Sequence, residues 1–296
     1  MKVSYCSLGC KVNEYEAVAV INQFLDQGFR LTPFNEEADV YIINTCTVTS
    51  NSDAKSRKMI RQASRRNPEA VVAVMGCFSQ LHPEDVKEIG ADIVIGTSNR
   101  HLLFDLCLDA LNKKNKHILI DDMKQGRNYE EIKIDRYLNH TRGFIKIEDG
   151  CDNFCSYCEI PYARGRVRSR KAIDILKEIQ KLTKQGMKEL VLSGINTGAY
   201  GEDLKDYHFV NLLSDILKEV KDLGRIRISS IEVTQLSTEL LDLIGNNRKH
   251  FCEHFHIPLQ NGSNEILKMM NRKYDNEFFF KKIEEIRQIM PEVNIT

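Results

Sequence analysis

Short apolar runs alternate with helical segments along this chain, and this alternation constrains the fold more than any other feature. In the first 112 residues the predicted strands lie at 3–10, 40–44, 71–75 and 92–95, with helical patterns at 13–27, 52–66 and 102–111 between or after them. Unbroken apolar runs separated by helices indicate parallel strands that are buried on both faces. The sequence therefore predicts an open α/β domain over residues 1–112.

A second alternation follows a charged stretch, residues 113–136, which we interpret as a linker. Over 137–296, strands are expected at 143–147, 189–192, 225–231 and 255–259, and helices at 171–184, 209–221, 238–244 and 277–290. Repeated βα units predict a barrel or partial barrel with its chemistry at the carboxyl ends of the strands. Four strands cannot close a barrel, and residues 293–296 look like the start of another, so we expect a truncated chain. Pro258 weakens the last strand, because proline suits strand ends and edges.

Composition narrows the class of protein. The chain has 296 residues, nine cysteines and a formal net charge of zero. It lacks an export signal at its start and an apolar stretch long enough to span a bilayer. We therefore expect a cytoplasmic protein without membrane contact, in which an odd number of cysteines favours metal binding or catalysis over disulfides. Any contact with nucleic acid must come from local basic patches.

Three cysteines recur at equivalent places in the first domain. Cys10, Cys46 and Cys77 each lie at or just after the carboxyl end of a predicted strand. Parallel strands end at the same edge of a sheet, and in open α/β sheets this is the edge where ligands bind. Small or turn-forming residues flank all three. The alternative is three unrelated buried cysteines, since free cysteine is often buried.

Three further cysteines stand in one loop, Cys151-Asp-Asn-Phe-Cys155-Ser-Tyr-Cys158. Thiols at this spacing can hold three corners of an iron–sulfur cube and leave the fourth iron open to a substrate or cofactor. Zinc sites need four ligands, so the alternative is a partial zinc site completed by a distant histidine. We interpret the remaining cysteines as packing residues, and two histidines in an apolar strand as hydrogen-bonded core or pocket residues. They are Cys6, Cys107, Cys252, His254 and His256.

Two basic stretches interrupt the neutral background. Residues 164–171 hold five cations, and residues 55–66 hold six cations and no acid, with Lys58, Arg61 and Arg65 on one helical face. Either stretch alone is typical of a solvated surface. Because both follow a cysteine at a strand end, together they favour a phosphate-bearing substrate.

The cysteine loop with Tyr157 before its last cysteine resembles the signature of the radical S-adenosylmethionine (SAM) enzymes. The wider segment 146–170 is similar to that of the methylthiotransferases, whose N-terminal cysteine motifs match 9–13, 44–48 and 76–80. Segments 193–198 and 256–263 match later parts of the same family. Within it, Gly9-Cys-Lys-Val-Asn13 looks most like the branch that modifies N6-threonylcarbamoyladenosine beside the tRNA anticodon.

The resemblance implies two [4Fe–4S] clusters. One, held by the cysteine loop, would bind SAM and support its cleavage to a 5′-deoxyadenosyl radical. The other, held by the first-domain cysteines, would carry the sulfur that is methylated and inserted. The first domain would then be the methylthiotransferase N-terminal domain and 137–296 a radical SAM core, without the last barrel strands and the C-terminal RNA-binding β-domain that members normally have. The implied ligands are Cys151, Cys155 and Cys158 for the first cluster, and Cys10, Cys46 and Cys77 for the second.

The implied reaction replaces the C–H at adenine carbon 2 with C–S–CH3 in a tRNA. We expect a monomeric transferase that receives electrons from a donor such as flavodoxin or ferredoxin. Besides Tyr157, the SAM-pocket candidates are Gly194, Glu232 and Gln260, whose alternative role is plain turn or strand-end structure. The alternatives for function are the same chemistry on a ribosomal-protein aspartate or on isopentenyladenosine in tRNA, and a non-enzymatic RNA-binding protein whose cysteines hold zinc.

Overall fold

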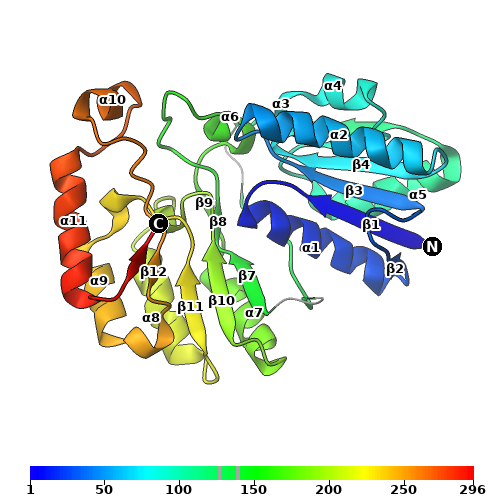
Figure 1. Ribbon diagram of the computed structural model, residues 1–296. Helices are drawn as coiled ribbons and strands as arrows, with labels where there is room; N and C mark the ends of the chain where they lie inside the picture. The colour runs from blue at the N-terminus through cyan, green and yellow to red at the C-terminus, as the bar shows by residue number, and fades with distance from the viewer. Residues whose placement is uncertain (126–127, 138–140) are drawn as a thin grey trace. The chain divides into compact units, whose positions relative to one another are not determined.

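The computed structural model describes residues 1–125, 128–137 and 141–296, and within them the chain forms two compact units (Figure 1). Residues 126–127 of the predicted linker and 138–140 of the predicted second domain lie outside the described residues. The first unit consists of Met1–Arg136 and Tyr162–Gly165, and the second of Tyr137–Pro161 and Arg166–Thr296. The sequence did not indicate that four residues from beyond the cysteine loop belong to the first unit.

A parallel sheet of six strands forms the first unit, in the order β2-β1-β3-β4-β5-β6. All four strands expected from the sequence are present. Strands β2 and β6 were missed because they are short edge strands without a buried apolar run, and β6 lies in the predicted linker. The bounds are β1 Lys2–Ser7, β2 Arg30–Leu31, β3 Val40–Thr45, β4 Val71–Gly76, β5 Ile93–Ile95 and β6 His117–Leu119.

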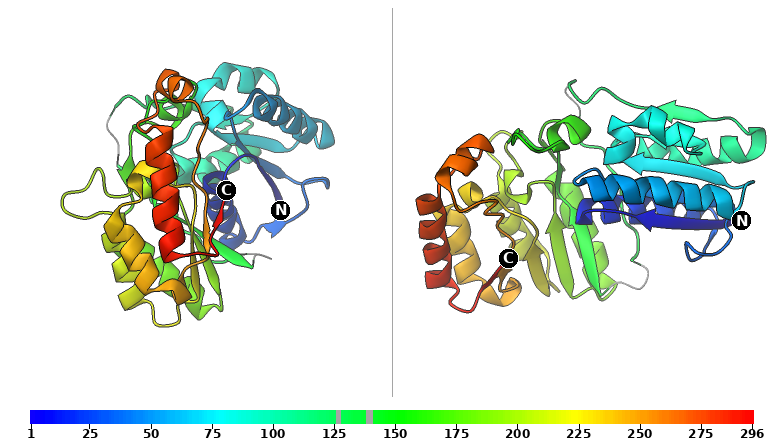
Figure 2. Two further views of the ribbon diagram at one scale, coloured as in Figure 1. Left: turned by 60° about the vertical axis from the view of Figure 1, so that its left-hand side comes forward. Right: turned by 45° about the horizontal axis from the view of Figure 1, so that its top comes forward.

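Helices cover both faces of this sheet (Figures 1 and 2). Side chains alternate between the two faces of a strand, so Val40 and Ile42 pack with α1 and α5 while Tyr41 and Ile43 pack with α2. The predicted helices are confirmed, and α3 and α4 are additional short helices. The bounds are α1 Lys11–Asp26, α2 Ser50–Arg66, α3 Cys77–Leu81, α4 Pro83–Glu88, the 3-10 turn η1 Arg100–Leu102 and α5 Leu103–Lys113.

The second unit contains a series of parallel strands. Three of these strands form a sheet in the order β11-β10-β7. A parallel bridge between Ser230 and His256 links the chain after β11 to the chain after β12, and β12 itself pairs with β13. The strand predicted at 255–259 is wrong in extent: it ends at Phe255, ahead of Pro258, which has no N–H to donate. The bounds are β7 Arg142–Lys146, β8 Glu148–Asp149, β9 Arg168–Ser169, β10 Glu189–Ser193, β11 Arg225–Ile228, β12 His254–Phe255 and β13 Asn294–Ile295.

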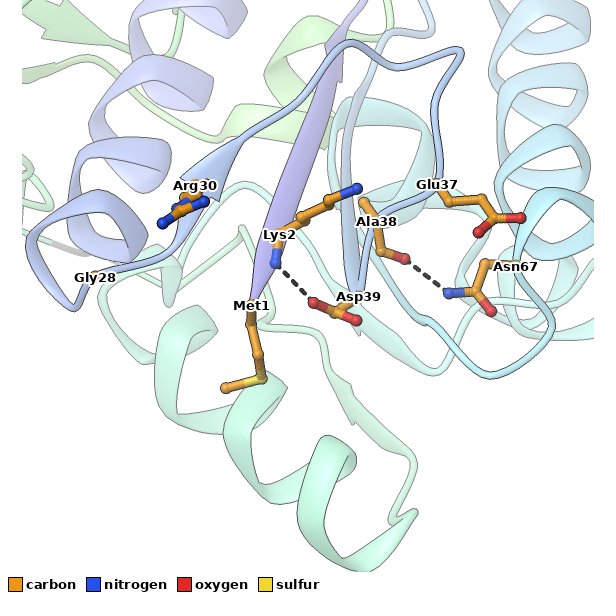
Figure 3. Close-up of a pocket in the computed structure, with 8 residues that line it drawn as sticks. All are labelled: Met1, Lys2, Gly28, Arg30, Glu37, Ala38, Asp39 and Asn67. Carbon is orange, nitrogen blue, oxygen red and sulfur yellow. Dashed lines mark hydrogen bonds between the residues drawn. The ribbon is translucent and has the colours of Figure 1, made fainter.

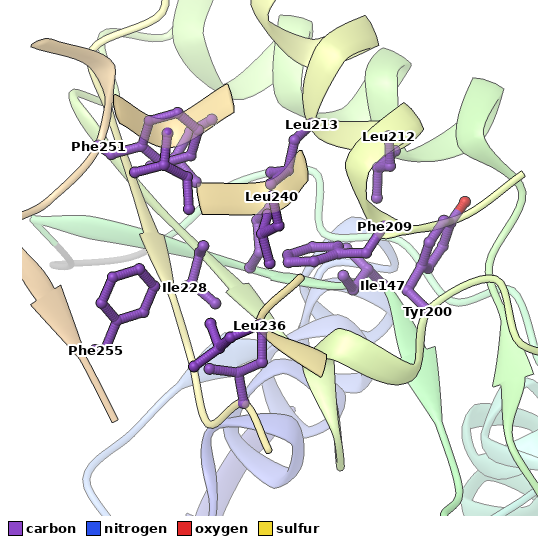
Figure 4. Packing of buried hydrophobic residues seen from close by; sticks show 14 of the residues in the cluster. Ile147, Tyr200, Phe209, Leu212, Leu213, Ile228, Leu236, Leu240, Phe251 and Phe255 are labelled. Atoms are coloured by element: carbon purple, nitrogen blue, oxygen red, sulfur yellow. The ribbon is translucent and has the colours of Figure 1, made fainter. Parts of the chain in front are cut away.

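Helices α7, α8, α9 and α11 pack successively along these strands (Figure 2). Apolar side chains between helices and strands, among them Phe209, Leu240 and Ile228, form one buried cluster (Figure 4). None of the helices in the described part of the chain is long and apolar enough to cross a bilayer. The bounds are α6 Ile160–Arg164, α7 Ala172–Lys184, η2 Thr197–Ala199, α8 Phe209–Glu219, η3 Val233–Gln235, α9 Thr238–Asn246, η4 Arg248–His250, α10 Asn264–Met269 and α11 Asn276–Ile289.

Candidate functional site

The three first-unit cysteines stand at the carboxyl ends of three adjacent strands. Cys46 follows β3 directly, Cys77 follows β4 as the first residue of α3, and Cys10 caps α1 after the turn that ends β1. Strands β1 and β4 flank β3 on either side, in parallel register. The three thiols therefore emerge at one edge of the sheet, where open α/β sheets bind ligands.

Glycine is required beside two of these cysteines. Gly9 has φ +93°, and a Cβ at this position would lie 2.5 Å from Cys46 Sγ and 2.6 Å from Cys46 Cβ. Gly76 has φ +108°, and a Cβ there would lie 2.4 Å from the carbonyl oxygen of Thr45. Both residues adopt a backbone conformation that side chains disfavour, and both allow neighbouring chain segments to approach closely. The glycines thus bring the cysteine-bearing turns together.

Hydrogen bonds from polar side chains stabilise the sheet edge that carries the three cysteines. Asn13 Nδ2 donates to the carbonyl oxygens of Leu8 (2.7 Å) and Thr45 (2.9 Å), which precede Gly9 and Cys46 in the chain. Asn44 Nδ2 donates to the Asn13 carbonyl at 2.8 Å. These bonds tie α1 to the ends of β1 and β3, so the turns that carry the cysteines are held by amide side chains rather than left as loose loops.

A buried arginine completes this edge. Arg164, from the segment that joins the first unit, donates from Nε to Cys77 Sγ at 3.3 Å and from Nη1 to Glu16 Oε1 at 2.9 Å. Arg164 and Glu16 are both fully buried. Burial raises the pKa of the Cys77 thiol to about 11, and the Arg164 guanidinium opposes this shift because it stabilises the thiolate. The Arg164 cation thus offsets part of the cost of a thiolate at this buried site.

The second cysteine set lies in one loop after the β7 strand. Burial, with smaller contributions from Glu148, Cys158 and Cys155, raises the pKa of Cys151 to about 12, against an opposing backbone hydrogen bond at Asn153. Thiols close enough to influence one another's ionisation fit a common ligand that withdraws the protons on binding. Phe154, inside the loop, has φ +45°, an unusual value that a bulky residue adopts only where the surroundings enforce it.

A turn after α10 holds this loop in place. Ser156 donates from Oγ to the Met269 carbonyl at 2.8 Å, and Asn271 Nδ2 donates to the Phe154 carbonyl at 2.9 Å. Arg272 Nη1 donates to Cys155 Sγ at 3.2 Å. The cysteine loop is therefore fixed by residues more than a hundred positions further along the chain, which no sequence spacing could reveal.

The arginine at the second triad also has an acidic partner. Arg272 forms an ion pair with Glu232, and its guanidinium carbon lies 5.0 Å from the centre of the Tyr274 ring. Burial raises the pKa of Glu232, and the Arg272 cation opposes this shift. Tyr274 in turn donates to the Leu259 carbonyl at 2.8 Å. Contacts thus connect Cys155 with Glu232 and with the segment that precedes Gln260.

The predicted SAM-pocket residues differ in their surroundings. Tyr157 is 49% exposed in the cysteine loop. Gly194 follows β10, where a Cβ would lie 2.1 Å from Glu148 Oε1, so this glycine is needed for packing against a buried carboxylate. Glu232 lies after β11 and pairs with Arg272, whereas Gln260 is exposed with φ +66°. All but Tyr157 follow strands of one parallel series, and contacts join Glu232 to the cysteine loop.

The two basic stretches differ in how exposed their cations are. In residues 164–171, Arg164 and Arg170 are fully buried and pair with Glu16 and Glu178, so these two arginines are not available to bind a phosphate. On α2 four cations are exposed, and we call them the α2 basic face. They are Lys55, Lys58, Arg61 and Arg65.

The remaining candidates are structural. Cys107 and Cys252 are buried, Cys6 is partly buried, and the rings of His254 and His256 hydrogen-bond to the Thr296 hydroxyl at 3.2 and 3.1 Å. The pocket in Figure 3 lies at the amino ends of the first-unit strands, opposite the cysteines. Its lining includes Lys2, whose N–H donates to the Asp39 carboxylate at 2.6 Å. Ligands of open α/β sheets bind at the other end, so this pocket is not the candidate site.

A zinc ion and an iron–sulfur cube make different demands on their donor atoms. Among the residues that the structure describes, histidine, cysteine and carboxylate side chains form no group of three or more that could hold one metal ion. Zinc needs four donors converging on one atom at about 2.0–2.3 Å. A cube instead spreads three thiolates over three iron atoms, and two sets of three cysteines with glycine-lined or hydrogen-bonded surroundings fit that larger group.

Comparisons with known proteins agree with this geometry. Residues 2–96 match the model of "Uncharacterized protein family UPF0004", and residues 145–296 match that of the "Radical SAM superfamily". A solved structure of the radical SAM methyltransferase TsrM from Kitasatospora setae aligns with all of this chain and 68% of its own, with a TM-score of 0.66 at 17% identity. The fold is thus that of a radical SAM enzyme, and the predicted fold class, an open parallel sheet followed by a partial radical SAM barrel, is confirmed.

Curated relatives define the family more closely. Threonylcarbamoyladenosine tRNA methylthiotransferase MtaB of Bacillus subtilis is 43% identical over 99% of this chain and 65% of its own length, and that of Aquifex aeolicus is 36% identical over 98% and 70%. A tRNA-2-methylthio-N(6)-dimethylallyladenosine synthase of Clostridium perfringens is 37% identical over 97% and 65%. The chain belongs to the radical SAM methylthiotransferase family. It spans about two thirds of the length of these relatives.

Proposed function

We propose that this protein inserts a methylthio group at carbon 2 of N6-threonylcarbamoyladenosine next to the tRNA anticodon. The observation that carries the proposal is the pair of cysteine triads, one in each unit. One triad stands on three adjacent strand ends and the other in a single loop. Support for the substrate comes from the relatives, since the 43% identical protein is named for threonylcarbamoyladenosine in tRNA.

Each triad would hold a [4Fe–4S] cluster. We assign Cys151, Cys155 and Cys158 to the cluster that binds SAM, and the first-unit triad to the auxiliary cluster. Bound clusters would supply one-electron reduction for SAM cleavage at one site and sulfur at the other, chemistry that side chains alone cannot perform on an aromatic C–H bond. In the second unit, Arg272 donates a hydrogen bond to Cys155 Sγ and pairs with Glu232.

The substrate would be bound through phosphates on the surface. The α2 basic face presents exposed cations on one helix, and each phosphate contact of this kind contributes to affinity in a salt-dependent way. Such contacts position a nucleic acid without reading its sequence, so base recognition must come from elsewhere. We further propose a cytoplasmic monomer that takes its electrons from a donor such as flavodoxin or ferredoxin.

Nucleoside analysis of total tRNA tests the proposal. We expect 2-methylthio-N6-threonylcarbamoyladenosine to disappear when the gene is deleted and to return when it is restored. The matched control is restoration with Cys155→Ala, which should leave the nucleoside absent. An unchanged level in the deletion strain would refute the assigned substrate.

A second candidate has a specific observation in its favour. The 37% identity to a tRNA-2-methylthio-N(6)-dimethylallyladenosine synthase supports methylthiolation of isopentenyladenosine. The same nucleoside analysis separates the two, because only the corresponding methylthio nucleoside would be lost. Loss of neither nucleoside, with a change in the mass of a ribosomal protein, would favour the aspartate substrate. Stoichiometric zinc without iron would favour a zinc-binding RNA-binding protein.

A further inference from the structure

Arg164 is a fully buried arginine in contact with the first triad, although it comes after the second triad in the chain. Its backbone is fixed in the first unit, where Thr97 Oγ1 donates to the adjoining Ala163 carbonyl at 2.6 Å. Its guanidinium engages Glu16 with both Nη atoms, at 2.9 and 3.2 Å. This bidentate contact fixes the plane of the guanidinium and directs the Nε edge towards Cys77 Sγ, at 3.3 Å.

A second buried arginine fixes the acid that orients Arg164. Arg100 Nη2 lies 2.9 Å from Glu16 Oε1, and Arg100 Nη1 pairs with Glu130 at 2.7 Å. Arg100, Glu16 and Arg164 are all fully buried. Buried ions are expensive to desolvate, and a pair is not in itself evidence of a stabilising role. This arrangement therefore calls for a role beyond stability, and the sulfur contact identifies one.

The same guanidinium acts on the surroundings of all three cysteines. Its Nη2 donates to Asn13 Oδ1 at 2.7 Å, and the Nδ2 of this amide bonds the carbonyls of Leu8 and Thr45, next to the Cys10 and Cys46 turns. Asn13 Oδ1 also lies 3.7 Å from Cys10 Sγ. Arg164 thus fixes which way Asn13 points, and through it the backbone at two cysteines, while it touches the third directly.

We propose that Arg164 is a positioning residue of the first triad, which orients Cys77 Sγ and raises the reduction potential of the cluster held there. The inference rests on the proposed function, in which this triad holds a [4Fe–4S] cluster. Hydrogen bonds to cluster sulfurs are one of the factors that set the potential. A cationic N–H donor beside a thiolate ligand favours the reduced cluster, because that state carries one more negative charge.

The test uses a full-length chain in which the second triad is replaced by alanine, so that any cluster signal comes from the first triad. Arg164→Gln and Arg164→Lys are compared in this background after anaerobic reconstitution. Arg170→Gln is the matched control, because it removes a fully buried arginine that pairs with Glu178 and lies outside the contacts of the first triad. The readouts are iron per chain, the thermal unfolding midpoint, and the cluster's midpoint potential by redox titration followed by electron paramagnetic resonance.

We expect Arg164→Gln to shift the redox equilibrium at least tenfold towards the oxidised cluster, about 59 mV for one electron. Arg164→Lys keeps the charge beside Glu16 but loses the Nε donor, so it should show a smaller shift in the same direction and should fold even if the glutamine variant does not. Arg170→Gln should keep the parent potential. A parent potential in Arg164→Lys, or an equal shift in Arg170→Gln, would overturn the inference alone. A parent chain that binds no iron would overturn the proposed function with it.

Discussion

Gly9→Ala tests the geometry of the first triad most sharply. The added Cβ would stand 2.5 Å from Cys46 Sγ and 2.6 Å from Cys46 Cβ. Rotation about χ1 can move Sγ away but leaves Cβ in place, so the backbone of one of the two turns must shift. To reach the 3.4 Å at which ordinary contact begins, the two Cβ atoms must separate by about 0.8 Å, the difference from 2.6 Å.

The magnitude follows from two separate costs. The positive φ of +93° costs an alanine about 1–2 kcal/mol, and relief of the overlap adds about 1–3 kcal/mol. Metal–ligand distances tolerate deviations of only about 0.2 Å, well below the displacement that Gly9→Ala imposes. We therefore expect the first cluster to be lost and the second to remain, with stability of the metal-free chain reduced by about 2–5 kcal/mol.

Gly28→Ala is the matched control. Gly28 has a similar φ of +82°, but a Cβ there would meet nothing within 4 Å. Gly28→Ala should lower the free energy of unfolding in urea only by the backbone cost, about 1–2 kcal/mol, and should keep its full iron content after reconstitution. Gly9→Ala should bind about half as much iron and sulfide. Full iron loading in Gly9→Ala, or an equal loss in Gly28→Ala, would refute the argument from close approach.

Three further outcomes are expected. Cys155→Ala should abolish SAM cleavage measured as 5′-deoxyadenosine, whereas Cys46→Ala should keep cleavage and stop sulfur insertion; equal loss of cleavage in both would undo this division. Reversing three charges of the α2 basic face should weaken tRNA binding and reduce the slope of log affinity against log salt concentration by about 2–3. An unchanged slope would contradict phosphate binding by this face. Burial raises the pKa of Cys77 from 9.0 to about 11, so the Cys77 thiol loses its proton at lower pH in the unfolded metal-free chain than in the folded one. The free energy of unfolding in urea should therefore fall between pH 9 and pH 11, by up to about 2–3 kcal/mol, and should fall less in Cys77→Ala.

The sequence predicted the fold where simple rules apply. Runs such as Val40–Asn44 and Val71–Met75 are apolar on both faces, and a strand buried between two helical layers needs that pattern. The same rule does not identify edge strands. Strand β2 is exposed and β6 is only half-buried, so neither needs an apolar run. The placement of the first-unit cysteines followed from strand direction alone.

The residues around the cysteines could not be predicted in the same way. Arg164 and Arg170 are buried while Arg166 between them is 68% exposed at its side chain, and the run of arginines gives no sign of this difference. A local hint existed in Glu16, a carboxylate within the apolar part of α1 that requires a buried cation. Arg272 had no such hint, because its contact with Cys155 depends on the tertiary fold.

Iron and sulfide analysis of the reconstituted chain tests the central claim, that each unit holds one cluster on three cysteines. We predict about eight iron and eight sulfide per chain, and about four of each when either triad is replaced by alanine. Both triple variants are needed, because only they assign each half of the iron to one triad. Stoichiometric zinc with no iron, or loss of all iron from either variant, would contradict the account.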